Sequence, residues 1–128
     1  AVEIKKKFPN LFFGLGTVLD KESYIRGSTA GFSFFVSPCI IHELLEVNPK
    51  NYIPAGETIS DFIFLKKKGY NLIKFFPASL MGAEKKLISI QNIIKGLSFI
   101  PTGGIDKNNI SSYLKLENVL CVGMSKFD

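Results

Sequence analysis

The stretch Leu72-Ile73-Lys74-Phe75-Phe76-Pro77 is a short apolar segment that contains one lysine and ends at a proline. Its length, its aromatic and β-branched content and its terminal proline predict a buried strand. Side chains alternate between the two faces of a strand, so Lys74 shares a face with Leu72 and Phe76. The sequence therefore predicts a lysine side chain among apolar neighbours.

Lys74 is for this reason the first candidate for chemistry. An ammonium group among apolar side chains needs a partner or loses its proton more readily. A lysine with a lowered pKa is a nucleophile that can form a Schiff base with a carbonyl substrate. The alternative interpretation is a lysine near the end of a strand whose amine reaches water.

Strand-like segments recur about every 20 residues, with amphipathic segments between them, and this alternation predicts βα units and a parallel α/β sheet. These strand-like segments begin near Leu11, Phe32, Tyr52, Leu72, Ser98 and Val119. An open doubly wound sheet and a (β/α)8 TIM barrel both fit the pattern. Gly14-Leu15-Gly16 does not continue to a third glycine at dinucleotide-binding spacing, which favours the barrel.

Six of the eight strands of such a barrel are visible, so we expect a single partial barrel domain of about six βα units over residues 1–128. The chain begins in a predicted helix and stops after a strand. We therefore expect about two further βα units before Ala1 and a final helix after Asp128.

Helix signals lie between the strands. Thr58 to Asp61 is a capping-box pattern, and Gly69 closes the helix that follows it. Glu84 to Lys95 has apolar residues at helical spacing. Further helix starts are predicted at Asp20, at Ser37-Pro38 and at Asp106, and Ala1 to Lys7 is expected to be helical.

The net charge of +5 comes from fifteen lysines and one arginine against eleven acidic residues. The two dense runs, Lys5-Lys6-Lys7 and Lys66-Lys67-Lys68, fall near the ends of predicted helices, where they complement the helix dipole. They lack the interleaved arginines and aromatics of a nucleic-acid surface. No apolar run approaches the roughly 20 residues that cross a bilayer. We expect neither nucleic-acid nor membrane partners.

The cysteine and histidine content argues against a metal site. His42 is the single histidine, and Cys39 and Cys121 have neither CxxC nor Cys/His spacing. We expect two buried thiols and no metal.

The predicted carboxyl ends of the strands carry small residues, hydroxyl groups and Lys74, and we expect no carboxylate among them. In parallel α/β proteins the chemistry gathers at these ends. Two glycine-containing segments follow consecutive late strands: Thr102-Gly103-Gly104 and Gly123-Met124-Ser125. Their exposed backbone N–H groups are of the kind with which barrels commonly hold a phosphate. The alternative is that these glycines only form turns.

Together these motifs resemble those of the bacterial 2-keto-3-deoxy-6-phosphogluconate (KDPG) aldolases, which also cleave 4-hydroxy-2-oxoglutarate (KHG). The resemblance extends over nearly all of the chain, and its most specific parts are the lysine and Pro-Thr-Gly-Gly-Ile motifs. The motifs are Gly14 to Leu19, Val36-Ser37-Pro38, Ile53-Pro54, Lys74 to Ala78, Pro101 to Ile105 and Asn118 to Ser125.

The resemblance implies a role for each matching residue. Lys74 would form the Schiff base, and the family's glutamate base and carboxylate-binding arginine would lie upstream of Ala1. The substrate-binding residues would be Thr17, Pro38, Phe76 and Thr102, and the phosphate-binding residues Gly103, Gly104, Gly123 and Ser125.

Four residues depart from the family's pattern. Met124 replaces a second glycine beside the implied phosphate site, and Ser79 stands where an acidic residue is frequent. Ala55 replaces the glycine of Ile-Pro-Gly, and Cys39 replaces the glycine after Ser-Pro. These changes affect the expected sugar selectivity more than the expected reaction.

The resemblance thus implies a class I aldolase without cofactor or metal, cytoplasmic and homotrimeric when intact. It would cleave KDPG to pyruvate and glyceraldehyde 3-phosphate, with KHG as a second substrate. Two alternatives stay open: a phosphate-binding barrel isomerase or synthase in which Lys74 acts without a covalent bond, and an inactive structural or binding fragment.

Overall fold

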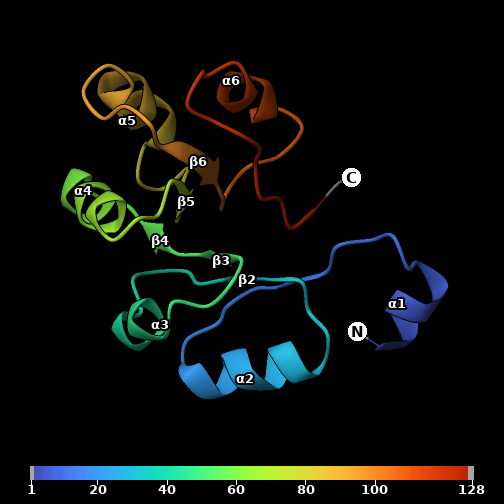
Figure 1. Ribbon diagram of the computed structural model, residues 1–128. Coiled ribbons are helices and arrows are strands. Elements are labelled where there is room, and N and C mark those ends of the chain that lie inside the picture. The colour runs from blue at the N-terminus through green and yellow to red at the C-terminus, as the bar shows by residue number, and fades with distance from the viewer. Residues whose placement is uncertain (1, 127–128) are drawn as a thin grey trace.

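Parallel strands form the centre of the molecule (Figure 1). The computed structural model describes residues 2–126 and contains two three-stranded sheets with their strands in chain order. The strands are β1 (Gly14–Leu15), β2 (Phe34–Val36), β3 (Tyr52–Ile53), β4 (Ala55–Gly56), β5 (Leu72–Phe75) and β6 (Ser98–Pro101). Every adjacent pair is parallel, so the predicted parallel α/β sheet is confirmed.

The two sheets, β1-β2-β3 and β4-β5-β6, meet at Pro54, the single residue between β3 and β4. Proline has no N–H to donate, and this interrupts the ladder. The Lys74 backbone N–H still donates to the Pro54 carbonyl oxygen at 2.9 Å, so β5 continues alongside the chain across the break.

The predicted strand near Val119 is reduced to isolated parallel bridges. Phe99 pairs with Val119, and Thr102 pairs with Gly123. This segment therefore follows the edge of β6 without forming a regular strand. Within the described part of the chain, the strands do not close into a barrel.

The described residues form six helices, and α2 to α6 follow the outer side of the strands in Figure 1. The helices are α1 (Val2–Lys7), α2 (Lys21–Thr29), α3 (His42–Val47), α4 (Ile59–Lys67), α5 (Ala83–Ile90) and α6 (Ile110–Leu114). None of them is long and apolar enough to cross a membrane.

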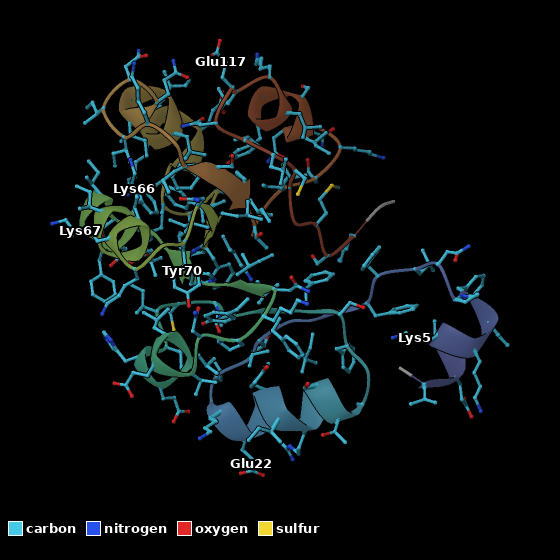
Figure 2. All side chains as sticks on the ribbon, in the orientation of Figure 1. Lys5, Glu22, Lys66, Lys67, Tyr70 and Glu117 are labelled. Carbon is cyan, nitrogen blue, oxygen red and sulfur yellow. The ribbon has the colours of Figure 1, made fainter. Side chains whose placement is uncertain are left out.

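Two predicted helix starts are confirmed in detail. Thr58 and Asp61 form a two-way capping box, in which each side chain accepts from the backbone N–H of the other. The Asp20 carboxylate accepts from the Ser23 N–H at 2.6 Å at the start of α2. Lysines end α1 and α4, as expected. Lys67 lies on the outer side of α4 in Figure 2, whereas the Lys66 ammonium donates to the Lys95 carbonyl oxygen in the segment after α5.

The start predicted at Ser37-Pro38 is wrong, because α3 begins only at His42. Ser37 is buried, and its hydroxyl donates to the Val18 carbonyl oxygen at 2.6 Å. That hydroxyl is committed to the sheet, and the chain needs four more residues before it turns into the helix.

Two other helices are shorter than predicted. α5 ends at Ile90, where the Ile93 N–H donates to the Ile90 carbonyl oxygen in a tighter i to i+3 turn. α6 begins at Ile110, because the Asp106 carboxylate accepts from the Asn108 N–H and holds a turn ahead of the helix.

The core divides into two clusters of unequal size. The larger cluster comes from α4, β5, α5, β6 and the segments around them, and includes Phe62, Leu65, Ile73, Phe75, Leu87, Ile90 and Phe99. The smaller cluster packs under β1 to β3, and its buried members are Val18, Phe35, Leu44 and Tyr52.

The β5 strand alternates as its sequence predicts. Ile73 and Phe75 are fully buried in the larger cluster, and the Phe75 ring lies 5.4 Å from that of Phe62 on α4. Leu72 and Lys74 are half-buried on the opposite face. Packing of Ile73 and Phe75 against the helices therefore fixes the direction of the lysine.

Candidate functional site

Lys74 lies in the middle of the molecule on the best-paired strand. In the register it stands between Ala55 of β4 and Ile100 of β6. Its Nζ lies 4.7 Å from the centroid of the Phe76 ring. The predicted apolar surroundings, with Phe76 on the same side as the lysine, are confirmed.

Burial lowers the pKa of the Lys74 ammonium below its ordinary value. Removal from water disfavours the charged form, and among the described residues no carboxylate forms an ion pair with Lys74. The neutral amine, which is the nucleophilic form, is therefore present at a lower pH than in an exposed lysine. The arrangement can support imine formation with a carbonyl compound.

A cavity of about 430 Å³ opens at the carboxyl ends of β2, β4 and β5. We call it the Phe76 cavity. It is lined by Pro38, Cys39, Ile40, Ala55, Gly56, Glu57, Asp61, Phe76 and Pro77. The structure thus brings together Pro38 and Phe76, two of the residues implied to bind substrate, and the Phe76 ring also contacts the Lys74 amine.

The expectation of no carboxylate at a strand end is wrong. Glu57 follows β4 directly and lines the Phe76 cavity with Asp61. The strand resumes after the Pro54 break and continues through Gly56, so Glu57 is the first residue beyond it. The sequence did not reveal this, because the pairing with β5 that maintains β4 is a tertiary contact. The register places Gly56 opposite Phe75, so Glu57 comes level with Phe76.

A second cavity, of about 570 Å³, lies beside the glycine pair after β6. We call it the glycine cavity, and it is lined by Pro77, Ser79, Leu80, Gly103 and Gly104. Gly103 and Gly104 have φ values of 102° and 69°, a conformation that favours glycine. A Cβ on Gly104 would lie 2.6 Å from the Ser79 Cβ, so the two loops touch.

Thr102 and Gly123 are also neighbours, through their parallel bridge. A Cβ on Gly123 would lie 2.4 Å from the Thr102 hydroxyl oxygen, which requires a glycine there. Ser125 is exposed, and among the described residues no hydrogen bond joins its side chain to the glycine loops. The helix predicted to start beside Gly104 starts at Ile110, so its amino end is not adjacent to this pair.

Thr17 lies apart from Lys74 in the order of the strands. It follows β1, which in sheet order is separated from β5 by β2 and by the β3–β4 position, and it lines a different cavity, with Gly16 and Arg26. Its φ of 56° is left-handed, which is strained for a β-branched residue. Strain of this kind concentrates at functional sites.

The prediction of two buried thiols is wrong, because Cys39 and Cys121 are free and exposed. Both cysteines lie outside the regular strands. Cys39 is in the loop after β2, and Cys121 is in the irregular segment beside β6. Within residues 2–126, no group of three or more His, Cys, Asp or Glu side chains could hold a metal ion.

The model of the KDPG and KHG aldolase family matches residues 1–128. The chain belongs to the KDPG and KHG aldolase family. The KHG/KDPG aldolase of Escherichia coli K12 is 35% identical over 125 residues, covering 95% of this chain and 59% of that protein. The 2-dehydro-3-deoxy-phosphogluconate aldolase of Pseudomonas aeruginosa is 33% identical, covering 94% and 56%.

Solved structures give the same result. The KDPG aldolase of Legionella pneumophila, crystallised with pyruvate captured as a covalent carbinolamine intermediate, has a TM-score of 0.89 and 35% identity. The match covers 94% of this chain and 60% of the Legionella enzyme. The Zymomonas mobilis enzyme with 3-phosphoglycerate has a TM-score of 0.88 and 31% identity. This chain spans somewhat more than half the length of such relatives.

Proposed function

We propose that the protein is a class I aldolase in which Lys74 forms a Schiff base with a 2-keto acid. The observation that carries the proposal is the half-buried Lys74 amine beside the Phe76 ring, with a pKa lowered by burial. Membership of the aldolase family and the covalent pyruvate adduct of the Legionella relative support the same chemistry. They do not favour a non-covalent isomerase, a synthase or an inactive fragment.

The proposed reaction begins with the Lys74 amine as the nucleophile. Lys74 Nζ attacks the C2 carbonyl carbon of the keto acid, and loss of water gives a protonated imine. A base removes the proton of the C4 hydroxyl, the C3–C4 bond breaks, and its electron pair moves into the imine to give an enamine and a free aldehyde. Protonation of the enamine at C3 and hydrolysis by water then release pyruvate and regenerate the amine. By resemblance the base is a glutamate of an earlier strand.

The proposed substrates are KDPG, which yields pyruvate and glyceraldehyde 3-phosphate, and KHG, which yields pyruvate and glyoxylate. Thr17 and Thr102 would bind the keto acid, and Pro38 and Phe76 would form the pocket wall. The phosphate would bind at Gly103, Gly104, Gly123 and Ser125. The positive φ values of the first two glycines and the close approach of Gly123 to Thr102 support this assignment.

We propose further that residues 1–128 are one domain, about six βα units of a (β/α)8 barrel. If β3 and β4 are counted as one strand interrupted at Pro54, the chain has five sequential parallel strands and a bridged segment near Val119 in the sixth position, and this supports that architecture. A homotrimeric, cytoplasmic enzyme that works without cofactor or metal is proposed on the family resemblance alone.

The test is turnover of KDPG by the full protein, followed through pyruvate release. We expect Lys74→Met to abolish it, because methionine keeps the apolar stem but has no nucleophile. Lys85→Met, at an exposed position on α5, is the matched control and should retain full activity. Measurable turnover in the Lys74→Met protein would overturn the covalent mechanism.

A further inference from the structure

The two cavities that flank Phe76 and Pro77 differ in charge. The Phe76 cavity has two acidic residues in its wall, Glu57 and Asp61, whereas the glycine cavity has neither acidic nor basic residues. Pro77 lines both, so the cavities are neighbours across this short segment. The Phe76 ring, which lines the first cavity, lies 4.7 Å from Lys74 Nζ, so a substrate attached to that amine starts beside the acidic wall.

The backbone of Glu57 is fixed from both sides. Its N–H donates to the Asp61 carboxylate at 3.1 Å, and its carbonyl oxygen accepts from Lys86 Nζ at 2.9 Å. The preceding carbonyl oxygen, of Gly56, accepts from the Phe76 N–H at 3.3 Å. Glu57 is therefore held at a constant position beside Phe76.

The two carboxylates of the cavity differ in their engagement. The Asp61 carboxylate accepts from the backbone N–H groups of Glu57 and Thr58, and the positive charge of Lys86 attracts it electrostatically. Among the described residues, no hydrogen bond or ion pair involves the Glu57 carboxylate, although Glu57 is half-buried. Lys86 bonds only to its backbone carbonyl oxygen. Of the two carboxylates at this wall, that of Glu57 is thus the one without a hydrogen-bond or ion-pair partner among the described residues.

We propose that Glu57 is a specificity-determining residue that excludes an anionic group from the Phe76 cavity. This inference rests on the proposed aldolase function. A half-buried carboxylate repels a second negative charge more strongly than one in bulk water does. A keto acid with a neutral or hydroxylated continuation is accepted there, and an anionic end has to reach the glycine cavity.

One consequence concerns the two proposed substrates. In KHG the second carboxylate is three bonds from C2, so it lies near the imine, whereas the phosphate of KDPG is on C6 and can extend further. Glu57 therefore favours the phosphorylated substrate over the dicarboxylate.

The experiment uses borohydride trapping on Lys74 in the full protein with three keto acids. Pyruvate tests imine formation itself. 2-Oxopentanoate and 2-oxoglutarate have equally long carbon chains and differ in a terminal carboxylate. We expect Glu57→Gln to increase trapping of 2-oxoglutarate about fivefold or more and to leave the other two unchanged, as expected for loss of one repulsive charge at short range. High salt should raise 2-oxoglutarate trapping in the unsubstituted protein.

Glu117→Gln is the matched control, because Glu117 is exposed and lies beside α6 at the outer edge of the molecule in Figure 2. It should leave all three rates unchanged. A less than twofold change for 2-oxoglutarate in Glu57→Gln, or an equal rise for all three acids, would overturn the role of Glu57. Failure of pyruvate to label Lys74 in the unsubstituted protein would instead overturn the aldolase function, and the inference with it.

Discussion

The β4–β6 half of the molecule and the β1–β3 half are built from the same kind of unit but packed to different degrees. β5 and β6 each have four residues and pair along their whole length, and they cover the larger core cluster. β1 and β3 have two residues each, and the buried part of their cluster has four members. Lys74 belongs to the well-packed half, and Thr17 to the other.

This difference indicates where the protein needs rigidity. A lysine that has to meet a carbonyl carbon gains from a strand fixed on both sides, because catalysis depends on orientation. The β1–β3 half relies more on polar contacts in its interior. Tyr52 donates to Ser37, and Ser37 donates to the Val18 carbonyl oxygen. The following predictions test this contrast.

The largest expected effect is on stability, from truncation of one phenylalanine in each half. Phe75→Ala should lower the free energy of unfolding by about 4–5 kcal/mol, and Phe35→Ala by about 3 kcal/mol, within the range for buried phenylalanines. Phe75 is fully buried and packs on Phe62, whereas Phe35 is 4% exposed and packs edge-on against Tyr24. Urea unfolding measures both. Equal losses, or a larger loss for Phe35→Ala, would contradict the contrast.

The polar contacts of the β1–β3 half should come next. Ser37→Ala should cost about 2 kcal/mol, because it leaves the Tyr52 hydroxyl and the Val18 carbonyl oxygen buried without a partner. Burial raises the pKa of Tyr52 to about 12, and the bond to Ser37 acts in the opposite direction. The variant should therefore raise this pKa further, as ultraviolet titration of tyrosinate would show.

Tyr52→Phe is the control for that prediction. It removes one donor but keeps the Ser37 bond to Val18, so its cost should be the smaller of the two. A Ser37→Ala protein as stable as the unsubstituted one would show that these polar contacts do not hold this half together.

The capping box of α4 predicts a pH dependence. Burial raises the pKa of the Asp61 carboxyl, but the N–H groups of Glu57 and Thr58 and the Thr58 hydroxyl more than offset it, so the pKa is lowered. The ionised carboxylate therefore stabilises the fold above the ordinary carboxyl pKa, and this is lost as the pH falls through the folded-state value. Asp61→Ala should cost about 1 kcal/mol at neutral pH.

In acid, below that folded-state value, the Asp61→Ala cost should disappear. Urea unfolding at both pH values measures it. A cost that is the same in acid would show that Asp61 acts by packing and not by its charge.

The smallest expected effect is a gain in stability when the candidate nucleophile is removed. The pKa of Lys74 is lower in the folded state, so its ammonium destabilises the fold at neutral pH, and this penalty fades as the pH rises through the folded-state value toward the ordinary lysine pKa. Lys74→Met should therefore gain under about 1 kcal/mol at neutral pH, a small figure because the side chain is only half-buried.

The gain should shrink in alkaline solution, and Lys85→Met should show none. Thermal unfolding over a pH series measures both variants. A Lys74→Met protein that is less stable at neutral pH would show that the ammonium has a stabilising partner in the folded protein.

Local patterns predicted the parallel sheet, the faces of β5 and the surroundings of Lys74. They succeeded because alternation on a strand and capping at Thr58 depend on neighbours in the sequence. The errors came from tertiary contacts. Ser37 does not cap a helix because Val18, from a different strand end, takes its hydroxyl. Glu57 was missed because the strand continues past Pro54, where only the pairing with β5 maintains it.

The central claim is that Lys74 is the lysine that forms the imine. The most direct measurement is peptide mapping after incubation with pyruvate and borohydride over a pH series. We expect a single labelled peptide, carrying Lys74, with labelling that persists below the pH at which exposed lysines react, because burial lowers the Lys74 pKa. Label on an exposed residue such as Lys107, with Lys74 unmodified, would contradict the account.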